Sequence, residues 1–397
     1  MIYLSSPIGL GHAQRDLAIA GQLRELCPDA QVDWLAQHPV TRLLEDRGER
    51  VHPASGRLDS ESAHIEASCG EHALNAFRAV RGMDELHVND FLVVQEVLAR
   101  GEFDLVVADE AWDIDHFLHE EPALKRFAYA WLTDFVGWLP VHEGGAAEAA
   151  LTADRNAEMI EPLATHPAVR DRSIFVGDPE DVLDAPFGPD LPGMRAWTEA
   201  NYDFCGYVTA PPAMLPNSRA VLRAGLGCGP DDRLCLVTVG GSAVGTHLLH
   251  RVLEAVPLAR TLDPSLRFLV VTGPRIDPTT VPQPQGVQVC GYVPDLHRYV
   301  TACDLAVVQG GLTTCMELTA GGTPFVFVPL RGHFEQQYHV RHRLERHGAG
   351  RCLDYAQATD PTVLAAALLG LRGRPEAGVP VPTDGARRAA RMLAELL

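Results

Sequence analysis

A histidine follows a glycine-rich turn close to the start of the chain. The turn, Gly9-Leu10-Gly11, comes soon after the apolar stretch Ile2–Ser5, and His12 stands where a helical pattern begins. Glycines allow a backbone to approach a ligand closely, and an imidazole exchanges protons near neutral pH. Asp109 directly follows a second apolar stretch, Leu105–Ala108. If both stretches are parallel strands, their carboxyl ends share one sheet edge, and the imidazole and the carboxylate could lie within reach of each other.

Such a pair would have a definite chemistry. An aspartate that accepts a hydrogen bond from one imidazole nitrogen fixes the tautomer and makes the other nitrogen a better base. A His12–Asp109 dyad would therefore deprotonate a hydroxyl group. The residues by themselves also allow structural roles: an exposed or capping histidine, and an aspartate that caps the next helix.

Two further glycine turns lie in the second half of the chain. Gly240-Gly241-Ser242 follows the apolar stretch Leu234–Val239, Gly310-Gly311 follows Leu305–Val308, and each turn precedes a helical pattern. The free N–H groups and the dipole at a helix N-terminus favour a bound phosphate. Glu317 comes about two helical turns later, where a carboxylate could accept hydrogen bonds from ribose hydroxyls. Helix-capping glycines and an exposed glutamate are the structural alternatives.

The candidate residues above follow short apolar stretches in which apolar and polar side chains do not alternate. Such stretches are typical of parallel strands covered by helices on both faces. The predicted strands are Ile2–Ser5, Val32–Leu35, Leu105–Ala108, Phe127–Trp131, Ile174–Val176, Leu234–Val239, Phe268–Val271, Val287–Cys290, Leu305–Val308 and Phe325–Val328. The helical patterns between them include Asp16–Leu26, Phe91–Ala99, His247–Leu262, Thr313–Ala320 and Gln336–His347. The alternation predicts two doubly wound α/β domains.

The length of 397 residues also fits two domains. We expect a first domain at 1–205, a turn-rich linker at 206–232, a second domain at 233–383, and an amphipathic helix at 384–397 that could dock on either domain.

Composition excludes some classes of protein. Lys plus Arg number 33 and Asp plus Glu 52, so the formal charge is −19, which argues against a nucleic-acid partner. The nine cysteines form no C-x-x-C pair, which favours buried thiols over a metal site. The chain opens without a basic and apolar leader and has no membrane-length apolar stretch, so a cytoplasmic location without a membrane span is expected.

Taken together, the motifs resemble the GT-B nucleotide-sugar glycosyltransferases. The branch is the one shared by the bacterial lipid II-forming N-acetylglucosaminyltransferase and the macrolide and natural-product glycosyltransferases. The likeness is carried by GLGHAQRDLAIAGQL at 9–23 and, more specifically, by 291–350, where a GG turn, a helix with Glu317, a G-x-P strand and an acid–Gln pair follow in the family's order. It implies two Rossmann-like domains that face a cleft, the first for an acceptor and the second for a donor.

The resemblance also assigns roles to single residues. The donor diphosphate would lie at Gly310, Gly311, Leu312, Thr313 and Thr314, with Gly241 and Ser242 on its other side. Glu317 would hold the ribose, Tyr292 and Val293 the base, Glu335 and Gln336 the sugar, and His12 with Asp109 would activate the acceptor. The chain departs from the family's D-Q-x-x-N-A pattern, because Glu335-Gln336-Gln337-Tyr338-His339-Val340 has neither its Asn nor its Ala. A shift by one residue makes Gln336 and Gln337 the sugar contacts instead, and both alignments stay open.

An acceptor would be bound by the first domain. Gly9 and Gly11 belong to its loop, and Trp131, Phe135 and Trp138 could form an apolar wall; a place in the core is at least as good an interpretation for these aromatic residues. The pairs His247/His250 and His339/His342 have a spacing that could bind a metal, but exposed helix histidines fit them better.

The function that follows is an inverting, metal-independent glycosyltransferase. It would use a UDP- or dTDP-sugar as co-substrate, need no cofactor, and act on a small, secondary-metabolite acceptor. The alternatives are a nucleotide-sugar 2-epimerase of the same fold and a non-catalytic nucleotide-binding partner of another glycosyltransferase. The sequence leaves the acceptor, the base and the choice between monomer and homodimer open.

Overall fold

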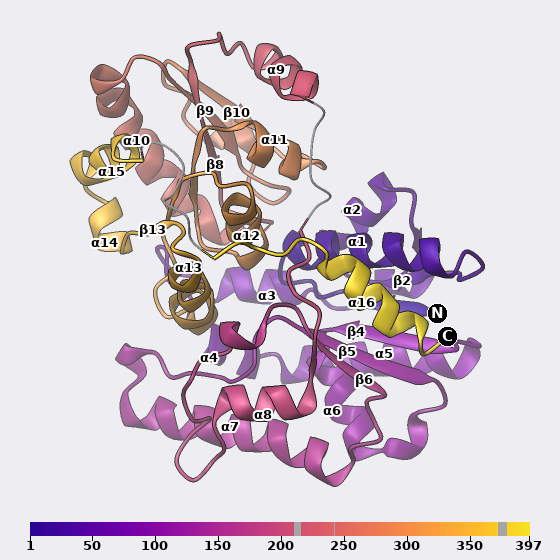
Figure 1. The fold of residues 1–397 in the computed structure, drawn as a ribbon. Helices are drawn as coiled ribbons and strands as arrows, with labels where there is room; N and C mark the ends of the chain where they lie inside the picture. Colours follow the sequence, from indigo (N-terminus) through magenta and orange to yellow (C-terminus); the bar gives the residue numbers. More distant parts are fainter. Residues whose placement is uncertain (210–215, 242, 372–378) are drawn as a thin grey trace. The chain divides into compact units, whose positions relative to one another are not determined.

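The computed structural model describes residues 1–209, 216–241, 243–371 and 379–397, which form two α/β units (Figure 1). The first unit comprises Met1–Ser68, Asn75–Thr209 and Thr383–Leu397, and the second comprises Cys69–Leu74 and Ala210–Pro382. Each unit contains one parallel sheet with helices around it. The prediction of two doubly wound α/β domains is therefore confirmed.

The first unit is built on a seven-stranded sheet in the order β3-β2-β1-β4-β5-β6-β7. Every pair of neighbouring strands is parallel, and the central strand β4 is buried along its whole length, as its sequence LVVAD without alternation predicts. The strands are β1 (Ile2–Leu4), β2 (Asp33–Leu35), β3 (Arg50–Val51), β4 (Leu105–Asp109), β5 (Ala128–Thr133), β6 (Arg172–Phe175) and β7 (Asp203–Phe204). The helices are α1 (Leu10–Leu26), α2 (Val40–Asp46), α3 (Glu61–Ala67), α4 (Ala76–Arg81), α5 (Asp84–Arg100), α6 (Trp112–Glu120), α7 (Gly145–Thr165), α8 (Met194–Asn201) and α16 (Gly385–Ala394).

The second unit has a six-stranded parallel sheet in the order β10-β9-β8-β11-β12-β13. Its strands are β8 (Arg233–Thr238), β9 (Leu266–Val271), β10 (Val287–Cys290), β11 (Leu305–Val308), β12 (Phe325–Phe327) and β13 (Arg351–Cys352). Its helices are α9 (Pro216–Gly225), α10 (Thr246–Leu262), α11 (Leu296–Ala302), α12 (Leu312–Ala320), α13 (Arg341–His347), α14 (Tyr355–Ala358) and α15 (Pro361–Leu369), with a π-helical segment at Glu335–Val340 before α13.

The predicted strands are all present, with small differences at their ends. The structure adds β3, β7 and β13, three edge strands of two residues each. Two residues cannot display a periodic pattern, so the sequence gives no signal for them.

The last helix docks on the first unit, where α16 lies beside α1 (Figure 1). Ala389, Ala390 and Leu393 are fully buried, and Arg388 donates from Nη2 to the carbonyl of Phe204 at 2.8 Å. The amphipathic pattern of 384–397 predicted a helix but left its partner open, and the structure assigns it to the first unit.

A short segment from the first half of the sequence belongs instead to the second unit. Within Cys69–Leu74, Ala73 forms a parallel bridge with Arg331, and His72 Nε2 lies 2.9 Å from the carbonyl oxygen of Val328. The predicted first domain, 1–205, contains no composition shift that marks this excursion.

The turn-rich stretch predicted as a linker, 206–232, is divided between the two units. Its first residues, up to Thr209, group with the first unit, and its later part forms α9 in the second unit. The nine cysteines form no disulfide; Cys205, Cys235, Cys303 and Cys315 are buried, and the others are partly buried. Across the described residues, no helix combines the length and apolar character that crossing a membrane would require.

Candidate active site

Strand order indicates where each sheet can hold a ligand. All strands are parallel, but the order in which they are added to the sheet changes side: β2 and β3 lie on one side of β1 and β4 on the other, and β9 and β10 lie on one side of β8 and β11 on the other. Ligands of open α/β sheets bind beyond the carboxyl ends of the strands at such a change of side. The turn before His12 and the residue Asp109 flank the first of these points, and the turns at 240–241 and 310–311 flank the second.

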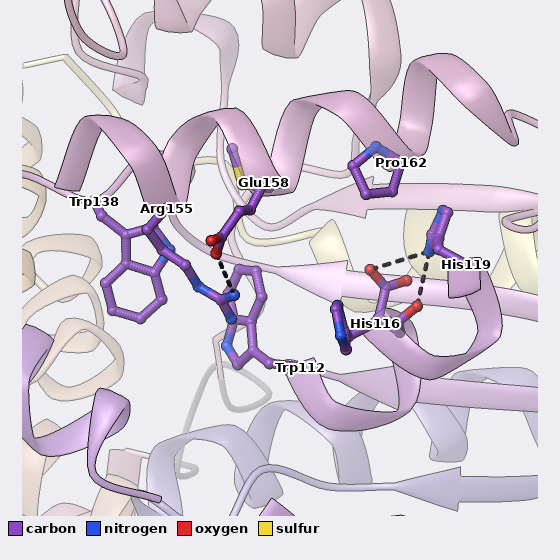
Figure 2. A pocket seen from close by; sticks show the side chains of 9 residues that line it. Trp112, His116, His119, Trp138, Arg155, Glu158 and Pro162 are labelled. Atoms are coloured by element: carbon purple, nitrogen blue, oxygen red, sulfur yellow. Dashed lines mark hydrogen bonds and ion pairs between the residues drawn. The ribbon is translucent and has the colours of Figure 1, made fainter. Parts of the chain in front are cut away.

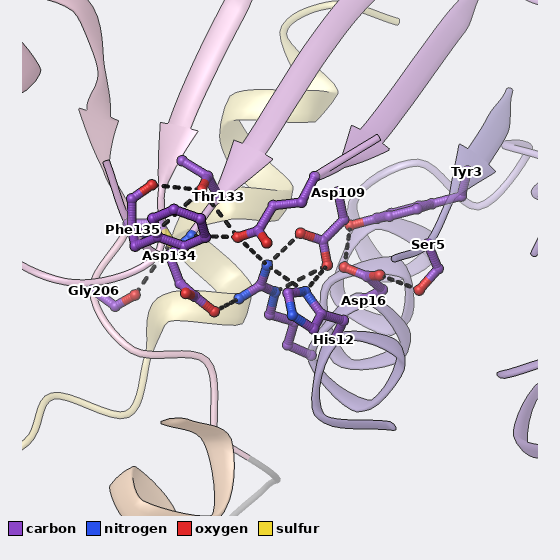
Figure 3. A network of polar contacts seen from close by, with 12 residues as sticks. Tyr3, Ser5, His12, Asp16, Asp109, Thr133, Asp134, Phe135 and Gly206 are labelled. Carbon is purple, nitrogen blue, oxygen red and sulfur yellow. Dashed lines mark hydrogen bonds and ion pairs between the residues drawn. The ribbon is translucent and has the colours of Figure 1, made fainter. Parts of the chain in front are cut away.

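His12 and Asp109 lie in direct contact (Figure 3). His12 sits in the first turn of α1 and Asp109 ends β4, and Nδ1 of the imidazole is 3.0 Å from Oδ2 of the carboxylate. The Asp109 side chain is fully buried, whereas the His12 side chain keeps 18% of its surface exposed. The structure thus brings the two predicted residues together, while their catalytic roles stay predictions.

Arg15 is a member of this site that the sequence analysis missed. It lies three residues after His12 on α1 and is 3% exposed. Its Nε donates to Asp109 Oδ2 at 3.1 Å, its Nη2 pairs with Asp109 Oδ1, and its Nη1 pairs with Asp134. The i,i+3 spacing, which puts both side chains on one helix face, is the signal that could have identified it.

These contacts set the charge of the dyad. Burial raises the pKa of Asp109, but the charges of Arg15 and His12 outweigh it and hold that pKa well below its usual range. Burial and the Arg15 charge lower the pKa of His12, but the carboxylates of Asp109 and Glu110 prevail and raise it to about 10. Arg15 Nη2 also lies 2.9 Å from His12 Nδ1, and because Arg15 has carboxylate partners of its own, we assign the Nδ1 proton to the bond with Asp109. Nε2 is then the nitrogen available to a substrate.

Glu110, the residue after Asp109, adds hydrogen bonds to the polar network around His12. Its backbone has a φ of 52°, a strained left-handed conformation for a residue other than glycine. Its Oε1 accepts hydrogen bonds from Thr133 Oγ1 at 3.0 Å and from the Asp134 backbone N–H at 3.1 Å. Burial and the neighbouring charge of Asp134 raise its pKa to about 7.

His12, Glu110 and Asp134 have ligand atoms within 4.8 Å of one another, which could suit a metal ion. The Arg15 guanidinium already supplies a cation there, since it pairs with Asp134 and lies 3.7 Å from Glu110. In the described part of the chain, neither His247/His250 nor His339/His342 belongs to a group of this kind.

In the second unit, the two glycine turns adopt conformations that favour glycine. Gly240 and Gly310 have φ values of 87° and 114°. Helix α12 begins directly after Gly311, and no side chain of the described residues caps it, so the N–H groups of its first turn are left for another acceptor. A Cβ at Gly245 would lie 2.7 Å from Gln309 Oε1, so the loops after β8 and β11 approach each other closely. The predicted diphosphate residues from both turns therefore lie at one edge of the sheet.

Other predicted donor residues take positions around this edge. Leu312 is buried, whereas Thr313, Thr314 and Glu317 on α12 are partly exposed. Tyr292 and Val293 follow β10 and are partly exposed as well. Ser242 lies outside the described residues.

The predicted sugar contacts begin the π-helical segment after β12. Gln336 is buried, and its Oε1 accepts from the Leu330 backbone N–H at 2.9 Å. Gln337 Nε2 donates to the Leu330 carbonyl at 2.8 Å. Both glutamines thus brace the loop that Glu335 follows, and the choice between the two possible sugar-contacting pairs stays open.

The aromatic residues predicted as an acceptor wall are buried. Trp131 has no exposed surface and belongs to the hydrophobic core of the first unit, and Phe135 and Trp138 are 5% and 3% exposed. Trp138 lines a hollow between α6 and α7 together with Trp112 (Figure 2). The structure therefore gives Trp131 the core role that the sequence had left as an alternative, because β5 lies in the middle of the sheet.

Comparison with known proteins gives a family match for the later part of the chain. Residues 234–394 match the glycosyltransferase family 28 C-terminal domain. Relatives include an uncharacterised glycosyltransferase of Methanosarcina mazei, 31% identical over 32% of this chain and 32% of the relative. Another is the UDP-N-acetylglucosamine–N-acetylmuramyl-(pentapeptide) pyrophosphoryl-undecaprenol N-acetylglucosamine transferase of Carboxydothermus hydrogenoformans, 31% identical over 40% of this chain and 43% of the relative. The chain thus spans less than half of the length of these curated relatives.

Solved structures resemble the whole chain. The spinosyn rhamnosyltransferase has a TM-score of 0.58 at 16% identity and covers 100% of this chain with 95% of its own, and it has also been solved in complex with thymidine diphosphate. The glycosyltransferase SnogD of Streptomyces nogalater has a TM-score of 0.57 at 18% identity, over 100% of this chain and 99% of its own. The predicted GT-B fold is confirmed for the chain, and the predicted family resemblance is confirmed for residues 234–394.

Proposed function

We propose that this GT-B chain, whose residues 234–394 match the glycosyltransferase family 28 C-terminal domain, is an inverting, metal-independent glycosyltransferase. It moves a sugar from a UDP- or dTDP-linked donor to a hydroxyl group of a small, secondary-metabolite acceptor. The observation that supports this most strongly is the family match over 234–394, which contains the glycine turn at the N-terminus of α12. The relative that uses UDP-N-acetylglucosamine and the neighbour solved with thymidine diphosphate support the two donor classes.

In the proposed reaction, His12 Nε2 removes the proton of the acceptor hydroxyl. Asp109 holds the Nδ1 proton, so the tautomer is fixed for this task. The acceptor oxygen forms a bond to the anomeric carbon of the sugar as the bond from that carbon to the diphosphate oxygen breaks. Because the attack comes from the side opposite the leaving group, the configuration inverts.

The departing nucleoside diphosphate needs stabilisation of its negative charge. The uncapped N-terminus of α12 offers free N–H groups and the positive end of the helix dipole, and the hydroxyls of Thr313 and Thr314 add donors. These groups take the part that a metal ion plays in other transferases. The protein's charge of −19 makes such local stabilisation necessary.

His12→Ala tests the dyad mechanism. We expect kcat for transfer to a hydroxyl acceptor to fall by about 10²–10⁴-fold, the usual contribution of a general base, while the nucleotide-sugar Kd stays the same. The donor would come from a thermal-shift screen against a panel of nucleotide sugars. Full transfer by His12→Ala would contradict the mechanism.

Incubation with UDP-N-acetylglucosamine and no acceptor separates the function classes. A glycosyltransferase leaves this donor largely intact and releases UDP when an acceptor is added. A 2-epimerase would produce the epimer without an acceptor, and a non-catalytic partner would bind nucleotide in calorimetry without releasing any from the sugar.

A further inference from the structure

A cavity lies beside the His12 network, at the carboxyl edge of the first unit's sheet. It encloses about 480 Å³, including the space open to solvent. The loops after β1, β2 and β4 line it, together with residues from α3 and α5. Glu110 belongs both to this lining and to the group formed with His12, so the cavity adjoins the proposed base.

The lining is strongly acidic. Glu61, Asp90, Glu110 and Asp113 contribute four carboxyl groups, and His87 is present, but the described residues of the lining include no Lys or Arg. Among the residues that the structure describes, no ion pair involves Glu61, Asp90 or Asp113. Asp90 is 3% exposed, and Glu61 and Asp113 keep part of their surface exposed; carboxylates removed from water in proteins are ordinarily paired.

Neutral groups provide the hydrogen bonds that these acids receive. Gln37 Nε2 lies 2.9 Å from both Glu61 Oε1 and Asp90 Oδ2, and the Asp59 backbone N–H donates to Asp90 Oδ1 at 2.7 Å. Burial raises the pKa of Glu61 to about 8, of Asp113 to about 7 and of Asp90 to about 6, and no positive side chain in the described part of the chain offsets this effect.

A second feature of the cavity points to a ligand. Ser6 lines it and is 2% exposed, and its hydroxyl has no hydrogen-bond partner among the residues that the structure describes. An unpaired buried hydroxyl costs about 1–3 kcal/mol, which a polar ligand in the cavity would recover. A metal ion fits less well, because Glu61, Asp90 and Asp113 do not belong to any group of ligand atoms within 4.8 Å in the described residues.

We propose that this cavity binds the acceptor through a positively charged amino group, so that the acceptor is a hydroxyl-bearing ammonium compound. Glu61, Asp90 and Asp113 receive the ammonium group, and Ser6 hydrogen-bonds a polar group of the same molecule. The hydroxyl is then presented toward His12 past Glu110. The role of the bound compound as an acceptor rests on the proposed glycosyltransferase function, whereas the binding of an ammonium group in the cavity does not.

The test uses a matched pair of small probes without any donor. trans-4-Aminocyclohexanol carries an ammonium group and a hydroxyl, and its N-acetyl derivative keeps the ring and the hydroxyl without the charge. Calorimetry or ligand-observed NMR on the full chain should give a Kd for the amine at least about tenfold lower, the order expected for a charge-assisted hydrogen bond. Equal binding of the two probes, or binding of neither, would overturn the proposal.

Substitutions test whether these carboxyl groups cause the preference for the amine. Glu61→Gln/Asp113→Asn should abolish the preference for the amine, whereas Glu120→Gln, an exposed charge on the same helix as Asp113, should retain it. A folded double variant that keeps the preference would contradict the assignment. If the double variant fails to fold, Asp113→Asn alone should reduce the preference, since it removes one carboxylate from a partly exposed position.

The proposed function can fail separately. If the chain binds the amine but no nucleotide sugar changes its Tm, the glycosyltransferase proposal is contradicted and the proposed cation site is unaffected. If the chain transfers a sugar but binds the two probes equally, the cation site is contradicted and the glycosyltransferase proposal is unaffected.

Discussion

At the scale of the residue, Asp109 shows how one buried carboxylate can organise a site. It lies between His12 and Arg15, two side chains of the same helix, and a second carboxylate, Asp134, holds the far side of the guanidinium. Buried ion pairs contribute little net stability, but removal of one partner costs about 3–5 kcal/mol because a charge is left unpaired. The consequence of this arrangement is therefore a fixed orientation of the His12 imidazole, more than a gain in stability.

The charge of His12 gives a prediction about pH. A base must be unprotonated to act, and the pKa of His12 is raised to about 10 chiefly by Asp109, against burial and Arg15. We therefore expect kcat/KM for transfer to rise with pH through the neutral range, about tenfold per pH unit. Asp109→Asn removes this raising charge and should move the ascending limb to lower pH while kcat falls. A flat profile in the wild type between pH 6.5 and 9 would contradict the role of His12.

At the scale of the element, the start of α12 is the part of the second unit best suited to an anion. Gly310 needs a left-handed φ of 114°, whereas Gly311 has a φ of −65°, which any residue adopts. The two adjacent glycines therefore have different physical roles. The first allows the turn, and the second leaves the helix N-terminus uncovered.

Alanine substitutions separate these roles. Gly310→Ala should lower the free energy of unfolding by about 1–3 kcal/mol, because alanine is strained at that φ. Gly311→Ala should leave Tm within a degree or two, because nothing lies within 4 Å of the added Cβ, but should raise the Kd of a nucleotide sugar where that methyl covers the N–H groups. Chemical denaturation and calorimetry measure both effects, and unchanged nucleotide binding in a folded Gly311→Ala would place the diphosphate elsewhere.

At the scale of the whole molecule, the order of segments along the chain differs from their grouping into the two units. The chain leaves the first unit, builds the second, and returns so that α16 packs on α1. The net charge of −19, which argued against a nucleic-acid partner, is also consistent with a cavity for a cation. Deletion of the last helix should therefore affect the first unit, although it is adjacent in sequence to the second.

Truncation at residue 383 tests this. We expect amide exchange to accelerate in α1 and β6, which lose the cover of Ala389, Ala390 and Leu393, while β8 and β11 keep their protection. Hydrogen-exchange mass spectrometry reports both units in one experiment. Faster exchange confined to the second unit would contradict the packing described above.

The sequence by itself determined the fold class and the positions of the central strands, because buried parallel strands require continuous apolar stretches. It also indicated the glycine turns and the histidine that follow those strands, since chemistry at a sheet edge needs particular residue types there. Tertiary structure alone decided which distant residues meet. Arg15 joins Asp109 across 94 positions, Glu61, Asp90 and Asp113 meet around one cavity, and Trp131 lies in the core. Such contacts depend on strand order and burial, which no local pattern encodes.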